Sequence, residues 1–192
     1  ANTRIIMDSI FSSRKALSDK NISELEKKEG KYCIYAFFVK KGKILEKYSK
    51  SRKLLYLGRT SRGITNRDLN EHLKNGKTPN SSFRRSMGAI LKKELKLSVL
   101  PRKLKNPKYD KYRFTENSEQ DLTNWIKKHC EFGYWISEEN VSKSELEHLE
   151  TKLTEFYKPS LNLAPKTKHL NKLANDIQSI RKICSQEWRD KL

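Results

Sequence analysis

The sequence predicts an α/β (α+β) domain with helical ends. Short runs rich in β-branched and aromatic residues alternate with longer amphipathic segments, and 192 residues suffice for one domain with a small appendage. The longest strongly apolar run, 33–39, has seven residues, whereas a membrane-spanning helix needs roughly 20. Cys33, Cys130 and Cys184 are scattered and lack disulfide or zinc spacing. We therefore expect a reduced, cytoplasmic protein without a membrane partner.

The predicted strands share β-branched and aromatic residues between turn-forming residues. The run 32–39 is the clearest, because an uninterrupted apolar run of this length is typical of a buried strand. The short run 54–57 ends at Gly58. In chain order the predicted strands are 32–39, 44–48, 54–57, 112–115 and 132–136.

The predicted helices share apolar residues spaced three or four positions apart. The clearest is 144–157, where Leu146, Leu149 and Leu153 recur at this spacing and which Pro159 ends. In chain order the predicted helices are 4–17, 66–74, 81–97, 119–129, 144–157 and 169–188.

Positive charge is concentrated in the middle of the chain. The net charge is +19, and residues 40–113, with 23 basic and 5 acidic residues, carry +18 of it. Residues 115–157 carry −6. A concentrated positive field attracts polyanions through the release of counterions, which favours nucleic acid. An anionic membrane is the main rival, but the sequence shows no strongly basic amphipathic helix with an aromatic apolar face. The simplest alternative is a solvated basic surface.

Five short motifs occur in a characteristic order. They are Cys33-Ile34-Tyr35, Tyr56-Leu57-Gly58, a helix with Arg67 and His72, a helix with Glu150, and Asn162 in a Pro-Ser-Leu-Asn segment. This order resembles the GIY-YIG nuclease superfamily over about residues 30–165. Each tripeptide is a weak signal alone, and the ordered set carries the resemblance.

The sequence departs from the family pattern in two places and leaves the phosphate-clamping arginine open. Cys33 stands where the family has its first glycine, and 21 positions separate the two motif tyrosines, enough for an inserted strand, turn and strand. Arg67 lies close to the family's usual place for the phosphate-clamping arginine, and Arg84 and Arg85 are rival candidates.

The resemblance implies a small central, mostly antiparallel β-sheet flanked by helices. We place a GIY-YIG-like nuclease domain at 30–165, with basic insertions at 40–53 and 76–111. A helical arm over 1–29 precedes it, and a C-terminal helix over 166–192 follows it.

Phosphodiester hydrolysis needs an activated water, positive charge near the non-bridging oxygens and a way to neutralise the leaving alkoxide. One hard cation can stabilise that alkoxide, and Mg²⁺ needs few protein ligands because it retains several waters. Glu150 lies about 40° from Leu146 around its helix and can point inward, whereas Glu147 and Glu155 point further out. We therefore predict one Mg²⁺ or Mn²⁺ ion per active site on Glu150, with Glu145 and Glu147 as alternatives.

The resemblance also assigns catalytic roles. Tyr35 would be the general base, and Tyr56 would position water or phosphate. Arg67 would clamp the scissile phosphate with its bidentate guanidinium. His72 would orient the nucleophile or transfer a proton, and Asn162 would tie the glutamate helix to the strands. The alternative for each is an ordinary structural role in the core or on the surface.

Other basic residues are predicted to contact nucleic acid. They follow the second tyrosine motif or lie on the predicted helix 81–97, whose N-terminus favours phosphate. These residues are Arg59, Arg62, Arg84, Arg85, Lys92, Lys93 and Lys96.

The predicted function is a divalent-metal-dependent endonuclease that cleaves double-stranded DNA, of restriction type or acting alone. One alternative is an RNA-cleaving defence or toxin nuclease, since the same site could serve RNA. Another is a nucleic-acid-binding protein that keeps the fold without catalysis. The expected partner is DNA, with RNA as the alternative, and the oligomeric state stays open, with a homodimer as one option.

Overall fold

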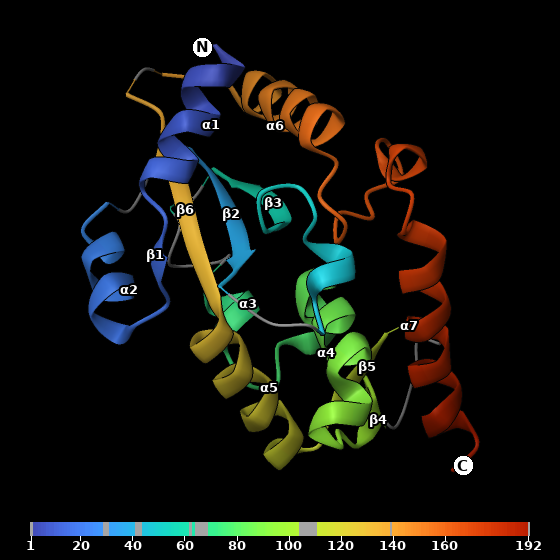
Figure 1. The fold of residues 1–192 in the computed structure, drawn as a ribbon. Helices are drawn as coiled ribbons and strands as arrows, with labels where there is room; N and C mark the ends of the chain where they lie inside the picture. The colour runs from blue at the N-terminus through green and yellow to red at the C-terminus, as the bar shows by residue number, and fades with distance from the viewer. Residues whose placement is uncertain are drawn as a thin grey trace.

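An antiparallel sheet of four strands, ordered β1-β6-β2-β3, forms the centre of the computed structural model (Figure 1). Its strands are β1 (Lys15–Ala16), β2 (Cys33–Val39), β3 (Leu54–Thr60) and β6 (Cys130–Ile136). A separate antiparallel pair joins β4 (Val99–Pro101) to β5 (Tyr112–Phe114). The predicted fold class is confirmed. The structure describes residues 2–28, 31–40, 44–61, 63, 69–103, 111–138 and 140–191.

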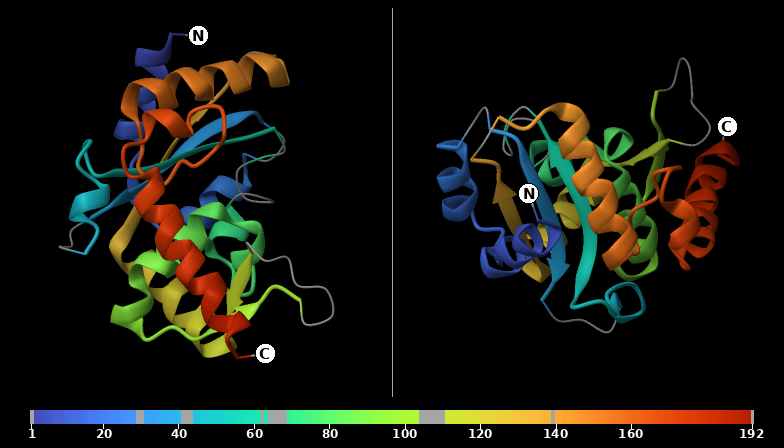
Figure 2. Two further views of the ribbon diagram at one scale, coloured as in Figure 1. Left: turned by 90° about the vertical axis from the view of Figure 1, so that its right-hand side faces the viewer. Right: turned by 90° about the horizontal axis from the view of Figure 1, so that it is seen from above.

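Helices lie around this sheet, with α1 and α6 near one end and α4, α5 and α7 near the other (Figures 1 and 2). The α-helices are α1 (Thr3–Ser12), α2 (Asp19–Glu26), α3 (Asn70–Leu73), α4 (Ser82–Leu95), α5 (Glu116–His129), α6 (Lys143–Tyr157) and α7 (Ala174–Arg189). Short 3₁₀ helices are η1 (Glu46–Tyr48), η3 (Thr78–Asn80) and η4 (Lys168–Leu170). No helix in the described segments is long and apolar enough to cross a bilayer.

Strand β2 is buried on both faces because a hydrophobic cluster packs against each of them. Tyr35 and Phe37 point to one side, where they pack with α4, α5 and α7 residues such as Phe83. Ile34 and Phe38 point to the other side, which α1 and α6 cover. Side chains alternate along a strand, so one apolar run supplies both cores. This explains why the run lacks polar residues.

The N-terminal helix ends earlier than its predicted bounds of 4–17. Helix α1 stops at Ser12, and residues 15–16 pair with β6 as a strand instead. The Ser13 hydroxyl donates to the Tyr134 carbonyl oxygen at 2.9 Å and accepts the Tyr134 backbone N–H at 2.8 Å. Gly133 lets α1 lie this close, because an added Cβ there would overlap the backbone oxygen of Ile10. Contacts with a distant strand therefore override the local helical pattern.

The predicted strand over 44–48 is wrong. Glu46–Tyr48 forms η1, and Leu45 is fully buried just before it. The Leu45 carbonyl oxygen accepts the Tyr48 N–H at 3.0 Å and the Ser49 hydroxyl at 2.7 Å. β2 already has β3 and β6 on its two edges, so it offers no free edge to this segment. The spacing of Leu45 and Tyr48 then fits a 3₁₀ turn, where residues three apart share a face.

The remaining predicted elements occur with small shifts at their ends. Predicted strands 54–57, 112–115 and 132–136 correspond to β3, β5 and β6. Predicted helices 81–97, 119–129 and 144–157 correspond to α4, α5 and α6. The last predicted helix divides into η4 and α7, and the described part of helix 66–74 contains α3.

Candidate active site

Tyr35, His72 and Ser81 form a buried hydrogen-bonded chain. The Tyr35 hydroxyl oxygen lies 2.9 Å from Nε2 of His72, and Nδ1 of His72 lies 2.6 Å from the Ser81 hydroxyl oxygen. Ser81 is the N-cap of α4, and its oxygen also accepts the backbone N–H of Arg84 at 3.0 Å. Strand β2, helix α3 and the start of α4 thus each contribute one member of this chain.

His72 is neutral at neutral pH. Burial of the ring and the nearby Arg84 guanidinium lower the pKa of His72 from 6.5 to about 3. With Nε2 protonated, the imidazole donates to Tyr35, and Ser81 can donate to Nδ1 while it accepts from Arg84. This tautomer directs an N–H group at the phenolic oxygen, which favours the ionised form of a phenol.

Gly58 makes the position of the Tyr35 ring possible. Tyr35 and Gly58 face each other across β2 and β3, and a Cβ added at Gly58 would overlap Cζ and Oη of Tyr35. Tyr56, two residues earlier, lies on the same face, with its ring centre 6.4 Å from that of Tyr35 and 5.6 Å from that of His72. The two motif tyrosines and the histidine therefore share one site.

Arg84, one of the predicted nucleic-acid contacts, has a fully buried side chain in this structure. Its guanidinium forms an ion pair with Glu119 of α5 at 2.7 Å and donates to the His72 carbonyl oxygen at 3.2 Å. The Glu119 carboxylate also accepts the Thr78 hydroxyl at 2.8 Å and the Phe114 N–H at 3.0 Å. Arg84 consequently holds the backbone of His72 in place, and its guanidinium points into the protein interior.

No pattern in the sequence predicts this network. Glu119 opens an ordinary charged helix, and nothing in its spacing distinguishes a buried carboxylate from a solvated one. Ser81 is the first residue of the predicted helix 81–97, and that position does not predict a hydrogen bond to His72. Both roles depend on α3 and α5 packing against α4.

Glu150 meets Arg59 at the edge of the sheet. The carboxylate of Glu150, on α6, accepts from Nε of Arg59 at 3.0 Å, and Glu147 lies 3.5 Å from the same guanidinium. Burial raises the pKa of Glu150 above 4.5, and the ion pair with Arg59 partly opposes this shift. The Glu150 side chain keeps 21% of its surface exposed. A carboxylate that is partly desolvated yet reachable can take a cation.

The register of β3 places Arg59 and the tyrosines on opposite faces of the sheet. Gly58 pairs with Tyr35, so Arg59 points to the other face, toward α6. β3 is an edge strand, so both faces border the same edge of the sheet. The candidate site therefore has two parts. Tyr35, Tyr56 and His72 lie on one face of β3, and Arg59 with Glu150 lies on the other.

Asn162 fixes the chain that follows α6 to β3. Its side-chain oxygen accepts the Leu57 N–H at 2.9 Å, and its amide donates to the Leu57 carbonyl oxygen at 2.8 Å. Asn171 donates to the Asn162 carbonyl oxygen at 3.1 Å. These bonds hold the end of the glutamate helix one residue from Gly58.

The other predicted contact residues occupy different environments. Arg62 and Arg67 lie outside the described residues. Arg85 is mostly buried and donates to the Pro79 carbonyl oxygen at 2.5 Å. Lys92 forms an ion pair with Glu187 at 2.5 Å, whereas Lys93 and Lys96 are exposed on α4 and at its end.

The residues present fit a hard cation that needs few protein ligands. Among the described residues no group of three or more His, Cys, Asp or Glu side chains could hold a metal. Glu150 supplies one partly exposed carboxylate, and Mg²⁺ commonly accepts one or two carboxylates with water and phosphate oxygens as further ligands. The carboxylate chemistry therefore matches Mg²⁺ or Mn²⁺ rather than zinc.

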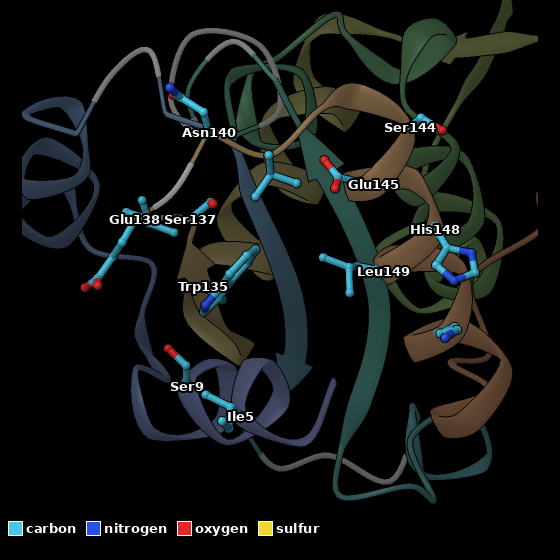
Figure 3. A pocket seen from close by; sticks show the side chains of 13 residues that line it. Ile5, Ser9, Trp135, Ser137, Glu138, Asn140, Ser144, Glu145, His148 and Leu149 are labelled. Atoms are coloured by element: carbon cyan, nitrogen blue, oxygen red, sulfur yellow. The ribbon is translucent and has the colours of Figure 1, made fainter. Parts of the chain in front are cut away.

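A cavity of about 1040 Å³ lies on the other side of α6, between α1 and the end of β6 (Figure 3). Its lining includes Glu138, Glu145 and His148, together with Trp135 and Lys152. In Figure 3, Glu145 and His148 project from α6, and Trp135 comes from β6. Two carboxylates against one lysine make this cavity unsuited to a polyanion.

Comparison with known proteins gives one match. A family profile described as the GIY-YIG catalytic domain matches residues 5–183. The match includes both tripeptide motifs, the glutamate helix and most of α7. No curated protein and no solved structure shows a significant match to the chain.

Proposed function

The chain belongs to the GIY-YIG nuclease family, and from this premise we propose that it is a divalent-metal-dependent endonuclease that hydrolyses double-stranded DNA, of restriction type. The observation that carries the proposal is the buried Tyr35–His72–Ser81 chain beside Tyr56, one β3 residue away from the Arg59–Glu150 pair. The concentration of +18 charges within 40–113 supports a polyanionic substrate.

Tyr35 acts as the general base in this proposal. With Nε2 of the neutral His72 ring protonated, the phenolic oxygen would receive its N–H, and this hydrogen bond would favour the phenolate. A phenolate accepts the proton of a water that attacks phosphorus. Tyr56 lies on the same face and orients that water or a phosphate oxygen. Arg67 clamps the scissile phosphate.

Glu150 holds the cation on the other side of β3. A bound Mg²⁺ or Mn²⁺ supplies Lewis acidity at the phosphate and stabilises charge on the leaving oxygen. Arg59 keeps the Glu150 carboxylate in place before metal and substrate arrive, because its guanidinium binds Oε2 directly. Asn162 maintains the spacing between the glutamate helix and β3.

The substitution Glu150→Gln tests the proposal. It keeps the size of the side chain and removes the charge that holds a hard cation, so we expect plasmid cleavage to fall by about 10²-fold or more at ordinary Mg²⁺. Binding of the plasmid in metal-free buffer should persist or tighten, because a negative charge near the phosphate is removed. Nicking and linearisation of supercoiled DNA measure the first effect, and filter binding measures the second.

Glu155→Gln is the matched control, because Glu155 is exposed on the same helix. Glu147 is unsuitable as a control, since it lies 3.5 Å from Arg59. Metal-dependent cleavage by the parent and the Glu155 variant, with loss in the Glu150 variant, supports the proposal. Equal cleavage by all three would remove Glu150 from the site. Parallel digestion of structured RNA identifies an RNA nuclease, and binding without cleavage by the parent identifies a non-catalytic protein.

A further inference from the structure

Helix α7 presents a continuous polar and basic stripe to α4. The stripe consists of residues spaced by three and four positions, which places them on one side of the helix. These residues are Gln178, Arg181, Lys182, Ser185, Gln186 and Arg189. A neighbouring side of α7 packs into the core through residues such as Ile177, Cys184 and Trp188. The apolar contacts of α7 with the core therefore come from residues outside the stripe.

The stripe lines a cleft of about 750 Å³ between α4 and α7, which we call the α4–α7 cleft. A second cavity of about 410 Å³ shares Leu163, Lys168 and Gln178 with it and continues the depression toward η4. The lining of the two, within the described residues, contains no Asp or Glu. Its basic residues are Arg85, Lys168, His169, Arg181, Lys182 and Arg189.

The carboxylates of α7 are directed away from this lining or lie at its end. Asp176 forms an ion pair with Lys47 at 2.9 Å, and Glu187 forms one with Lys92 at 2.5 Å. Asp190 accepts a hydrogen bond from Gln186 at 2.6 Å, beyond the last stripe residue. These three carboxylates of α7 therefore have partners other than the cleft lysines, Lys168 and Lys182.

The α4–α7 cleft adjoins the candidate active site through two segments. Ser82, which lines it, follows Ser81, the hydrogen-bond partner of His72. Leu163, which also lines it, follows Asn162, the residue bonded to β3. Arg181 spans the cleft and donates to the Ser82 hydroxyl at 3.1 Å. A linear polyanion in the active site can therefore continue along α7.

We propose that the α4–α7 cleft binds the phosphodiester backbone of the nucleic acid on one side of the scissile bond. Guanidinium, ammonium and amide donors without carboxylates are the groups that bind phosphate oxygens. From Gln178 to Arg189 the stripe runs about 16 Å along the helix, the length of about five phosphates of one duplex strand. This inference rests on the proposed function, because a nuclease substrate is the polyanion concerned.

The experiment compares two pairs of lysine substitutions that change the net charge equally. Lys168→Gln with Lys182→Gln removes two charges from the α4–α7 cleft. Lys20→Gln with Lys27→Gln removes two exposed charges from α2 and the residue after it, on the other side of the sheet (Figure 1). Binding to a duplex of about 30 base pairs is measured without metal over a salt series, where each lost phosphate contact lowers the slope of log affinity against log salt by about 0.9.

We expect the cleft pair to lower this slope by up to about 1.8 and to raise KM for cleavage while kcat stays near the parent value. The α2 pair should keep the parent slope. Cleavage by the parent with equal slopes for both pairs overturns the cleft inference and leaves the nuclease function intact. If the parent binds but does not cleave, and the cleft pair lowers the slope, the cleft inference stands and the nuclease function is overturned. Absence of binding by the parent overturns both.

Discussion

Tyr35 and Gly58 show how one missing side chain positions the proposed general base. The Tyr35 ring occupies the space where any other residue at position 58 would place its Cβ. The ring is buried among Phe37, Tyr56 and His72, so it has little freedom to move aside. Cys33, which replaces the family's first glycine, is itself buried in the same core. The second motif glycine therefore carries the steric requirement here.

We expect Gly58→Ala to lower cleavage by about 10²-fold, because the displaced Tyr35 ring loses its bond to His72. The loss of stability should be about 1–3 kcal/mol, the usual cost of overpacking. Cleavage rates and chemical denaturation measure the two effects, and Tyr35→Phe provides the reference for loss of the hydroxyl alone.

Gly76→Ala is the control for this substitution. Gly76 has a φ of +78° and open space around its Cβ position, so alanine there costs backbone strain without touching Tyr35. It should destabilise the protein mildly and keep cleavage near the parent rate. Full activity in the Gly58 variant would show that the Tyr35 ring can reach His72 from another position.

At the scale of elements, the buried Arg84–Glu119 pair joins α4 to α5 behind the active site. The pair is fully desolvated, and Thr78, Thr123 and backbone groups complete its hydrogen bonds. A buried pair of this kind costs much to break, because removal of one partner leaves a buried charge. It fixes the position of α3 as well, since Arg84 binds the His72 carbonyl oxygen.

Glu119→Gln should lower the free energy of unfolding by about 3–5 kcal/mol, because the Arg84 charge loses its buried partner. Denaturation by urea measures this change. Glu116→Gln, at an exposed position in the first turn of the same helix, should change stability by at most about 1 kcal/mol. Similar small losses in both variants would mean that water or another group can replace the Glu119 carboxylate.

Across the whole molecule, carboxylates line one cavity and basic residues line another. The acidic cavity beside α6 and the basic α4–α7 cleft belong to different ends of the structure. A polyanion is attracted to the second and repelled from the first, so the separation can orient a nucleic acid before contact. The excess of basic residues within 40–113 adds to the attraction. Part of this charge is offset inside the protein, because Arg84 is buried against Glu119 and Lys92 forms an ion pair with Glu187.

Acid should destabilise the whole fold through His72. The folded protein keeps this histidine neutral down to about pH 3, whereas the unfolded chain protonates it below about pH 6.5. The unfolded state therefore binds more protons in this window, and stability falls as the pH decreases from 6.5 toward 3, by up to about 1.4 kcal/mol per pH unit. Above pH 6.5 this contribution is constant.

Unfolding free energies of the parent and of His72→Gln across this range measure the effect. The variant should show the smaller slope, because it has no imidazole to protonate on unfolding. His169→Gln, at an exposed position on η4, should keep the parent slope. Parallel curves for the parent and His72→Gln would show that the buried imidazole is protonated in the folded state.

The fold class, most strands and helices, the family motifs and the net positive charge can be predicted from the sequence, because each depends on local composition or on residue order. It also indicated that Glu150 points inward, since the spacing of leucines fixes one face of a helix.

Packing between distant elements sets which polar residues are buried together and which segment pairs with which strand. Ser13 bonds to β6, β2 has no free edge for residues 44–48, and Arg84 forms an ion pair with Glu119 inside the domain. The basic stripe on α7 becomes a cleft only because α4 lies opposite. Such partners are distant in sequence, and their pairing depends on packing between elements. The periodicity of one segment does not predict this packing.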